Sequence, residues 1–192
     1  MTESSPRPNP VNDLSISPEA ANLFGIAISL PLLALLVGLY IFFSPDHSLV
    51  VHLPDLLGMI LFIGAIILGI FIHEIIHALG WSYFGNIPLR RIRINFFART
   101  MTPYALALDP MPAKGYRLGT ALPGLLLGAV PFVLGTILGK PSISLFGMIF
   151  SMAASGDLLV LWIIRHVNAG DPVQDHPSRV GCVVISNRPN PP

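Results

Sequence analysis

Four long apolar runs dominate this sequence, and they restrict the chain to a bundle of membrane-spanning helices. The runs cover residues 20–43, 56–80, 119–139 and 144–164. Each approaches or exceeds the roughly 20 residues that a helix needs to cross a bilayer. Charged residues make up only 11% of the chain, whereas soluble domains carry about 25%. The sequence therefore predicts an all-α integral membrane protein with four transmembrane helices.

The segments outside these runs set the limits of the domain. Residues 1–17 are polar and residues 186–192 are rich in proline, so both are expected to be disordered tails. Ser17 followed by Pro18 is a helix start signal, which places the beginning of the membrane domain at residue 18. A cleaved signal peptide is a poorer interpretation, because the first run is too long and no small-residue cleavage site follows it. Residues 18–185 are thus predicted to form one membrane domain.

Lysine and arginine residues lie almost entirely on one side of the predicted bundle. The long loop between the second and third runs, residues 81–118, carries six of them: Arg90, Arg91, Arg93, Arg99, Lys114 and Arg117. Four more arginines precede the first run or follow the fourth, and only Lys140 falls in the other two loops. Because basic loops stay on the cytosolic side, we expect a multi-pass cell-membrane protein with both termini and the long loop in the cytosol.

The long loop contains two candidate strands. Residues 91–96 alternate polar and apolar side chains, and residues 102–108 form a second extended segment. With a turn at residues 98–101, they predict a small cytosolic β-hairpin between the second and third helices. An edge of this hairpin is suited to pairing with an extended substrate; the alternative is a basic surface hairpin that contacts only anionic headgroups. We take three residues of the second strand as candidate substrate-binding residues: Thr102, Pro103 and Tyr104.

Small residues mark the expected contacts between helices. They recur at four-residue spacing on the third and fourth runs: Gly124 and Gly128, Gly135 and Gly139, and Gly147, Ser151 and Ser155. Such stripes let helix backbones approach closely in lipid. Pro123 and Pro131 are expected to kink the third helix. For most of these positions the pattern predicts packing and no chemistry.

One polar motif interrupts the second apolar run. His73, Glu74 and His77 form the pattern His-Glu-x-x-His at a depth where lipid-facing residues are apolar. Ionisable side chains at membrane depth are energetically expensive, so they indicate a functional site. Four residues apart on a helix, His73 and His77 share one face and are spaced to bind one Zn²⁺ ion, with Glu74 as general base. The motif predicts a metalloprotease-type site within a membrane helix.

A catalytic zinc site normally takes three protein ligands, so the chain must supply a third at the same depth. Asp157 is the other acidic residue within an apolar run, and it follows Gly156, which would let two helices approach closely. Counted from the cytosolic ends of their helices, His73 and Asp157 both lie roughly 10–12 Å below the membrane surface. Asp157 is therefore the predicted third ligand. Capping of a helix break, pairing with Arg165 and a place in a proton path are its alternative roles.

These residues resemble a known family. A His-Glu-x-x-His helix continued by Ala-Leu-Gly, a proline-bearing loop and Gly-Asp in the last span are similar to the Putative zincin peptidase family. That family comprises small bacterial four-span proteins described as a domain of unknown function. Residues 171–181 resemble the segment that follows the last span in the family, and the similarity covers roughly residues 55–185.

The family is similar in design to the site-2 proteases, which cut substrates within the membrane. This resemblance implies that His73, His77 and Asp157 bind the metal and that Glu74 is the general base. Site-2 proteases carry Leu-Asp-Gly at the aspartate, whereas this chain reads Ser-Gly-Asp-Leu. The chain also has no PDZ-like insertion and no extra membrane helices. Zinc binding is thus better supported than cleavage of any particular substrate.

The predicted function is zinc-dependent hydrolysis of a peptide bond at or just within the membrane, with Zn²⁺ as the cofactor. The expected partners are the lipid bilayer and a membrane-protein or peptide substrate. No nucleic acid is expected, and the chain is compatible with an oligomer. Two other functions would use the same polar cluster: non-catalytic zinc binding, and transport of ions or protons.

Overall fold

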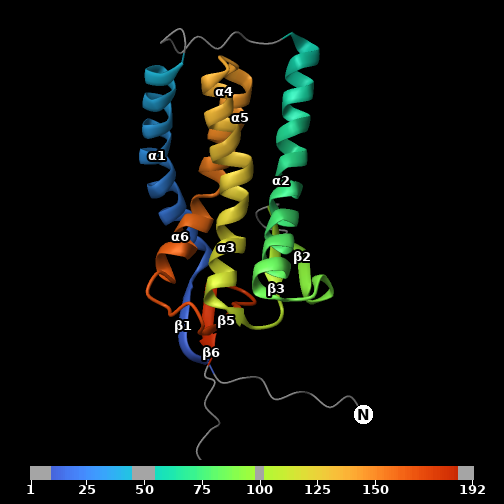
Figure 1. Ribbon diagram of the computed structural model, residues 1–192, viewed down its shortest axis with the longest axis vertical. Coiled ribbons are helices and arrows are strands. Elements are labelled where there is room, and N and C mark those ends of the chain that lie inside the picture. Colours follow the sequence, from blue (N-terminus) through green and yellow to red (C-terminus); the bar gives the residue numbers. More distant parts are fainter. Residues whose placement is uncertain (1–9, 45–54, 98–101, 186–192) are drawn as a thin grey trace, which may run out of the picture.

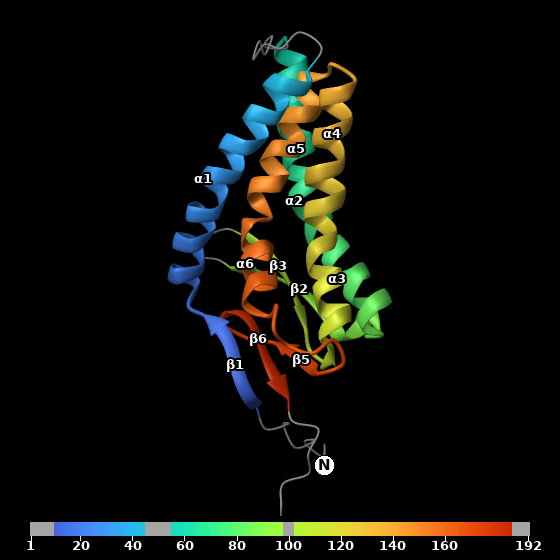
Figure 2. The ribbon, with the colours of Figure 1, turned by 60° about the vertical axis from the view of Figure 1, so that its left-hand side comes forward.

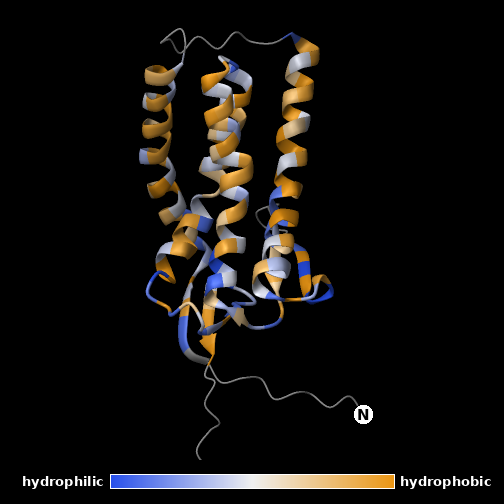
Figure 3. Cartoon of the chain, viewed as in Figure 1, coloured by the Kyte–Doolittle hydropathy of each residue, from blue (hydrophilic) through white to orange (hydrophobic). Residues whose placement is uncertain are grey.

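Four helical spans form the body of the molecule (Figure 1). The computed structural model describes residues 10–44, 55–97 and 102–185. The spans cover Pro18–Phe43, Leu56–Gly85, Ala113–Ile137 and Pro141–Ile163, and each is long and apolar enough to cross a membrane. Hydrophobic residues predominate along the helices, whereas hydrophilic residues gather at one end of the bundle (Figure 3), and many large hydrophobic residues of the spans are exposed. The chain therefore has four helices with the length and composition of membrane spans, as the apolar runs predicted.

The first two spans are continuous helices with defined ends. Helix α1 (Pro18–Phe43) begins where the Ser17 side chain accepts a hydrogen bond from Ala20 N at 3.2 Å. Helix α2 (Leu56–Gly85) begins in the same way at Asp55, which accepts from Gly58 N at 2.9 Å. It ends at Asn86, whose φ of 55° stops the helix. The second span therefore continues past Gly80, where the apolar run ends.

The other two spans are interrupted helices. The third consists of α3 (Ala113–Pro123), a π-helical segment (Gly124–Ala129) and α4 (Val130–Ile137). The π-helical segment lies between Pro123 and Pro131, and a proline lacks the N–H that continues an α-helical hydrogen-bond pattern. The fourth consists of α5 (Pro141–Ala153) and α6 (Ser155–Ile163), which meet at Ala154.

The small residues of the third and fourth spans pack against each other. A Cβ atom on Gly128 would lie 2.6 Å from Ser151 Oγ, and one on Gly147 would lie 2.2 Å from Phe132 N. Gly135 is in similar contact with Ser144, at 2.4 Å from its N atom. At these glycines the backbones of the third and fourth spans are in close contact, as the small-residue stripes predicted.

The expectation of an all-α chain is wrong, because the described residues include six strands in two antiparallel sheets. The two-stranded sheet pairs β2 (Ile92–Phe97) with β3 (Thr102–Ala107) and forms the hairpin that the sequence predicted. The turn expected at residues 98–101 lies outside the described residues. A short 3-10 helix (Leu89–Arg91) leads from α2 into β2.

The second sheet has the strand order β1-β6-β5-β4. Its strands are β1 (Pro10–Ile16), β4 (Met111–Pro112), β5 (Pro172–Asp175) and β6 (Val180–Ile185). Strand β1 lies within the segment that the sequence assigned to a disordered N-terminal tail, and its pairing with β6 is the reason for its order. Residues 1–9 and 186–192 lie outside the described residues.

Both sheets lie at the same end of the bundle, called the sheet end below (Figure 1 and Figure 2). A buried apolar cluster joins the four-stranded sheet to α2, α3 and α6 there, and its large members are Trp81, Met111, Tyr116, Ile164, Val173 and Cys182. This core fixes the four-stranded sheet against the turns of α2, α3 and α6 that lie at the sheet end.

Candidate metal centre

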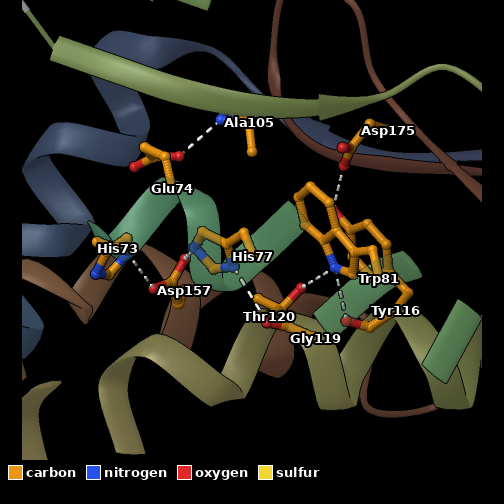
Figure 4. Close-up of polar contacts among 10 residues, drawn as sticks. All are labelled: His73, Glu74, His77, Trp81, Ala105, Tyr116, Gly119, Thr120, Asp157 and Asp175. Atoms are coloured by element: carbon orange, nitrogen blue, oxygen red, sulfur yellow. Dashed lines mark hydrogen bonds and ion pairs between the residues drawn. The ribbon is translucent and has the colours of Figure 1, made fainter. Parts of the chain in front are cut away.

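His73, His77 and Asp157 converge on one point between α2 and α6 (Figure 4). His73 Nε2 lies 3.2 Å from Asp157 Oδ2, and His77 Nε2 lies 3.2 Å from Asp157 Oδ1. Both histidines are buried, because α2 packs against α3 and this face of α2 also meets Asp157 of α6. One ligand atom from each of the three residues can be chosen so that all lie within 4.8 Å of one another. The structure thus brings together the three residues that the sequence selected.

These spacings suit a small divalent cation. In a tetrahedral zinc site with bonds of about 2.0–2.1 Å, neighbouring ligand atoms stand about 3.3 Å apart. The two His–Asp distances of 3.2 Å are close to that value, each to a different oxygen of Asp157, and one ligand atom from each of the three residues fits within 4.8 Å of the others. Two imidazoles and one carboxylate are also a usual protein ligand set for zinc. The residues therefore fit the metal that the motif implies.

The hydrogen bond of His77 orients its ring for binding a cation. His77 Nδ1 lies 3.2 Å from the carbonyl oxygen of Gly119, which can only accept, so Nδ1 carries the proton and donates. In the neutral ring, Nε2 then presents a lone pair toward Asp157. Asp157 Oδ2 lies 3.2 Å from His73 Nε2 and is buried, and no described residue forms a hydrogen bond of regular geometry with it. A cation at this point would satisfy lone pairs that otherwise face each other.

Aromatic packing holds the His77 ring in place. The ring stacks on Trp81 with centroids 5.2 Å apart, and Trp81 stacks on Tyr116 at 5.5 Å. Trp81 Nε1 donates to the Tyr116 carbonyl at 3.2 Å and lies 3.3 Å from Thr120 Oγ1. Such supporting contacts fix the orientation of a metal-binding histidine.

The close approach behind the site involves α2 and α3. A Cβ atom on Gly80 would lie 2.8 Å from Gly119 Cα, so these two glycines permit the contact. The sequence attributed close approach to Gly156, and this attribution is wrong, because a Cβ there would meet nothing within 4 Å. Asp157 instead gains its position from the break at Ala154, which places it in the first turn of α6. Arg165 donates to the carbonyl of Trp162 and not to Asp157.

Glu74 lies beside the group formed by His73, His77 and Asp157 and points toward β3. Its Oε2 accepts a hydrogen bond from Ala105 N at 2.6 Å (Figure 4). The group of potential ligands contains His73, His77 and Asp157 but not Glu74. The carboxylate is thus held next to the centre by the two-stranded sheet, in a position separate from the ligands.

The centre opens into a cavity of about 770 Å³. Side chains from α2 and α6, the first turn of α1, strand β3 and the segment from Asp175 to Gly181 line it. Of the three candidate substrate-binding residues, Tyr104 lines the cavity. Pro103 is buried in β3 opposite Phe96, and the side chain of Thr102 is not among those described. The sheet end therefore forms one wall of the cavity and the helices form the other.

Asp175 is a cavity residue that sequence reasoning missed. Its Oδ1 accepts from Tyr116 Oη at 2.5 Å, and its Oδ2 accepts from Ala107 N at 2.9 Å. Burial raises the pKa of Asp175 to about 6, although both hydrogen bonds oppose the shift. The only signal in the sequence was the resemblance of residues 171–181 to a family segment, which carried no mechanistic meaning.

A family comparison agrees with this geometry. The model of a family described as Putative zincin peptidase matches residues 66–171, or 106 of the 192 residues. The chain belongs to this family. The matched region includes His73, Glu74, His77 and Asp157 and ends before Asp175. No curated protein and no solved structure matches the chain.

Replacing Asp157 with asparagine should weaken metal binding while the chain stays folded. Asparagine keeps the shape of the side chain but removes the negative charge that faces the two imidazoles. Outer-shell changes alone cost about 10–100-fold in metal affinity, so loss of a charged ligand should cost at least that much. Competition with a chromophoric chelator would measure the affinity. Asp171→Asn is the matched control, because Asp171 bonds to Asn168 outside the centre; equal affinities in wild type and Asp157→Asn would remove Asp157 from the site.

Proposed function

We propose that this protein is a zinc-dependent peptidase that hydrolyses a peptide bond at or just within the membrane. The observation that carries the proposal is the convergence of His73, His77 and Asp157 beside Glu74 in a large cavity. Membership of the zincin family supports the same reaction class. The direct test is a search for new N-termini in membrane proteins incubated with zinc-loaded and chelator-treated enzyme, with Glu74→Gln as the inactive comparison.

The residues of the site have separate roles in the proposed reaction. His73, His77 and Asp157 would hold the ion, and zinc, when bound, would polarise a peptide carbonyl and make water more acidic. Glu74 is the general base: it takes a proton from the attacking water and gives it to the leaving amine. The hydrogen bond from Ala105 N holds this carboxylate in place before substrate arrives. Water reaches Glu74 through the cavity, since lipid supplies none.

The arrangement of ligands favours catalysis over a structural metal site. Structural zinc sites usually have four protein ligands, whereas catalytic sites have three and leave one position open. The group found among the described residues has three members, and Glu74 turns toward Ala105. A fourth protein ligand from the described residues would have favoured a purely structural role.

The substrate proposed for this site is an extended peptide segment that enters along β3. This strand pairs with β2 on one side, and Tyr104, Ala105 and Leu106 line the cavity. The N–H groups of Ala105 and Ala107 point away from β2, because both bind carboxylates on that side. A substrate strand added to this edge would therefore use the outward carbonyl groups of β3 or displace Glu74 from Ala105. A hairpin that binds only lipid headgroups would not need this edge inside the cavity.

We also propose that the sheet end faces the cytosol. Among the described residues, Arg90, Arg91 and Arg93 adjoin or lie in the two-stranded sheet at that end, whereas Lys140 starts α5 at the other. In a Cys182→Ser background, Lys140→Cys should react with a membrane-impermeant maleimide added to intact cells, and Arg165→Cys should react only after lysis. The reverse labelling pattern would overturn the orientation.

A further inference from the structure

Side chains of β5 join the two sheets at the rim of the cavity. Strand β3 and strand β5 belong to different sheets, so no backbone ladder connects them. Asp175 Oδ2 accepts from Ala107 N at 2.9 Å, and Gln174 Nε2 donates to Leu108 O at 2.5 Å. The neighbouring β5 residues Gln174 and Asp175 thus bind the neighbouring residues Leu108 and Ala107 at the end of β3.

All the N–H groups on the edge of β3 that faces the cavity are accounted for. In an antiparallel pair, successive N–H groups alternate between the partner strand and the outside. The outward positions of β3 are Pro103, which has no N–H, Ala105, which donates to Glu74, and Ala107, which donates to Asp175. The two donors therefore each bind one carboxylate, two residues apart on one strand.

The spacing links the two carboxylates mechanically. A strand rises about 3.3 Å per residue, so the contacts at Ala105 and Ala107 are about 7 Å apart along β3. If the strand slides or tilts at Ala107, the Ala105 N–H moves away from Glu74. A hydrogen bond of 2.6 Å to a carboxylate is sensitive to displacements of a few tenths of an ångström. A shift of β3 at Ala107 would therefore change the contact between the Ala105 N–H and Glu74.

We propose that Asp175 is a positioning residue that sets β3 at the height where the Ala105 N–H binds Glu74. Asp175 has a rigid base for this role, because β5 pairs with β6 and β4 and because Tyr116 Oη donates to its second oxygen at 2.5 Å. Tyr116 also stacks on Trp81, which stacks on His77. The same aromatic column therefore supports the metal-binding ring and the residue that positions the general base. This role gains catalytic meaning only if Glu74 acts as proposed above.

The test follows the amide groups of Ala105 and Ala107 in protein labelled with ¹⁵N-alanine. In zinc-loaded wild type, both amides should exchange slowly with solvent and resonate downfield, as carboxylate-bound amides do. Asp175→Ala should speed exchange at Ala107 and also at Ala105 by about tenfold or more, since a hydrogen bond to a charged group is lost at each. Asp175→Asn, which keeps an acceptor oxygen, should restore part of the protection. Zinc content should stay near that of wild type in both variants.

Glu74→Ala separates positioning from general support of the fold. In wild type this change should speed exchange at Ala105, whereas in Asp175→Ala it should add almost nothing, because the Glu74 bond is already lost. Additive effects of the two changes would show that Asp175 only stabilises the hairpin, and an unchanged Ala105 amide in both Asp175 variants would overturn the proposal outright. Asp109→Ala is the control. It removes the exposed Arg91–Asp109 ion pair, which anchors the same hairpin at a point outside the cavity.

This readout is independent of peptidase activity. If the protein binds zinc and cleaves nothing, the peptidase proposal fails, and the Ala105 amide still reports whether Asp175 positions Glu74. If Glu74→Gln abolishes cleavage but the Asp175 variants leave Ala105 protected, the positioning role fails alone.

Discussion

His77→Ala should remove most of the bound metal from the purified protein. His77 offers Nε2 to the centre at 3.2 Å from Asp157, and Gly119 holds its other ring nitrogen. Alanine deletes the ligand and leaves His73 and Asp157, which are too few for tight binding. Because weaker, outer-shell changes already cost about 10–100-fold in affinity, we expect a loss beyond that range. Elemental analysis after purification in detergent should give about one zinc per wild-type chain and close to none in the variant.

The control for this experiment must separate loss of a ligand from loss of packing. His77 is buried against Trp81, so His77→Ala also removes an aromatic contact. His73→Ala tests the same ion from the other imidazole, and His166→Ala changes an exposed histidine that is not part of the group. Zinc should be lost in the first variant and kept in the second, with helix content unchanged in both. A wild-type protein that binds no metal after zinc supplementation would contradict the peptidase proposal and favour a proton relay through the same residues.

The membrane helices could be predicted from the sequence because their signal is local. A run of apolar residues indicates both that a segment is a membrane-spanning helix and how long the helix is. The hairpin β2–β3 was also predictable, since the alternating first strand, the extended second segment and the short connection lie within one loop. In both cases the residues that determine the element are neighbours in the chain.

The four-stranded sheet could not be predicted, because its pairings are not local. Strand β1 near the N-terminus pairs with β6 near the C-terminus, and β4 contributes only Met111 and Pro112. Strands this short carry little pattern, and their stability depends on partners that the sequence does not identify. Residues 10–16 therefore read as a tail until β6 is placed beside them.

The candidate site shows the same division. His73, Glu74 and His77 form a local motif, and a depth estimate from helix length was enough to select Asp157. The role of the Gly119 carbonyl could not be predicted from the sequence. Every residue has a backbone carbonyl, and only the packing of α3 on α2 places that of Gly119 beside His77. Asp175 was missed for a related reason: its partners Ala107 and Tyr116 lie 68 and 59 residues away in the chain.

Glu74→Gln should keep the metal and abolish hydrolysis. Glutamine has almost the same shape and its amide oxygen still accepts the hydrogen bond from Ala105 N, so the fold and the three ligands should be undisturbed. It has no basic oxygen at neutral pH, however, and it takes no proton from water. Positioned general bases contribute about 10²–10⁴-fold to rate, and we expect a loss of that order.

The decisive measurement combines zinc content with the rate of cleavage of one membrane substrate in the same samples. Glu19→Gln is the matched control, because it makes the same chemical change in a cavity-lining carboxylate on α1, outside the group of potential ligands. Full zinc content with loss of cleavage in Glu74→Gln alone would assign the proton transfer to Glu74. Undiminished cleavage in zinc-loaded Glu74→Gln would show that another group takes the proton, since a glutamine cannot do so at any working pH.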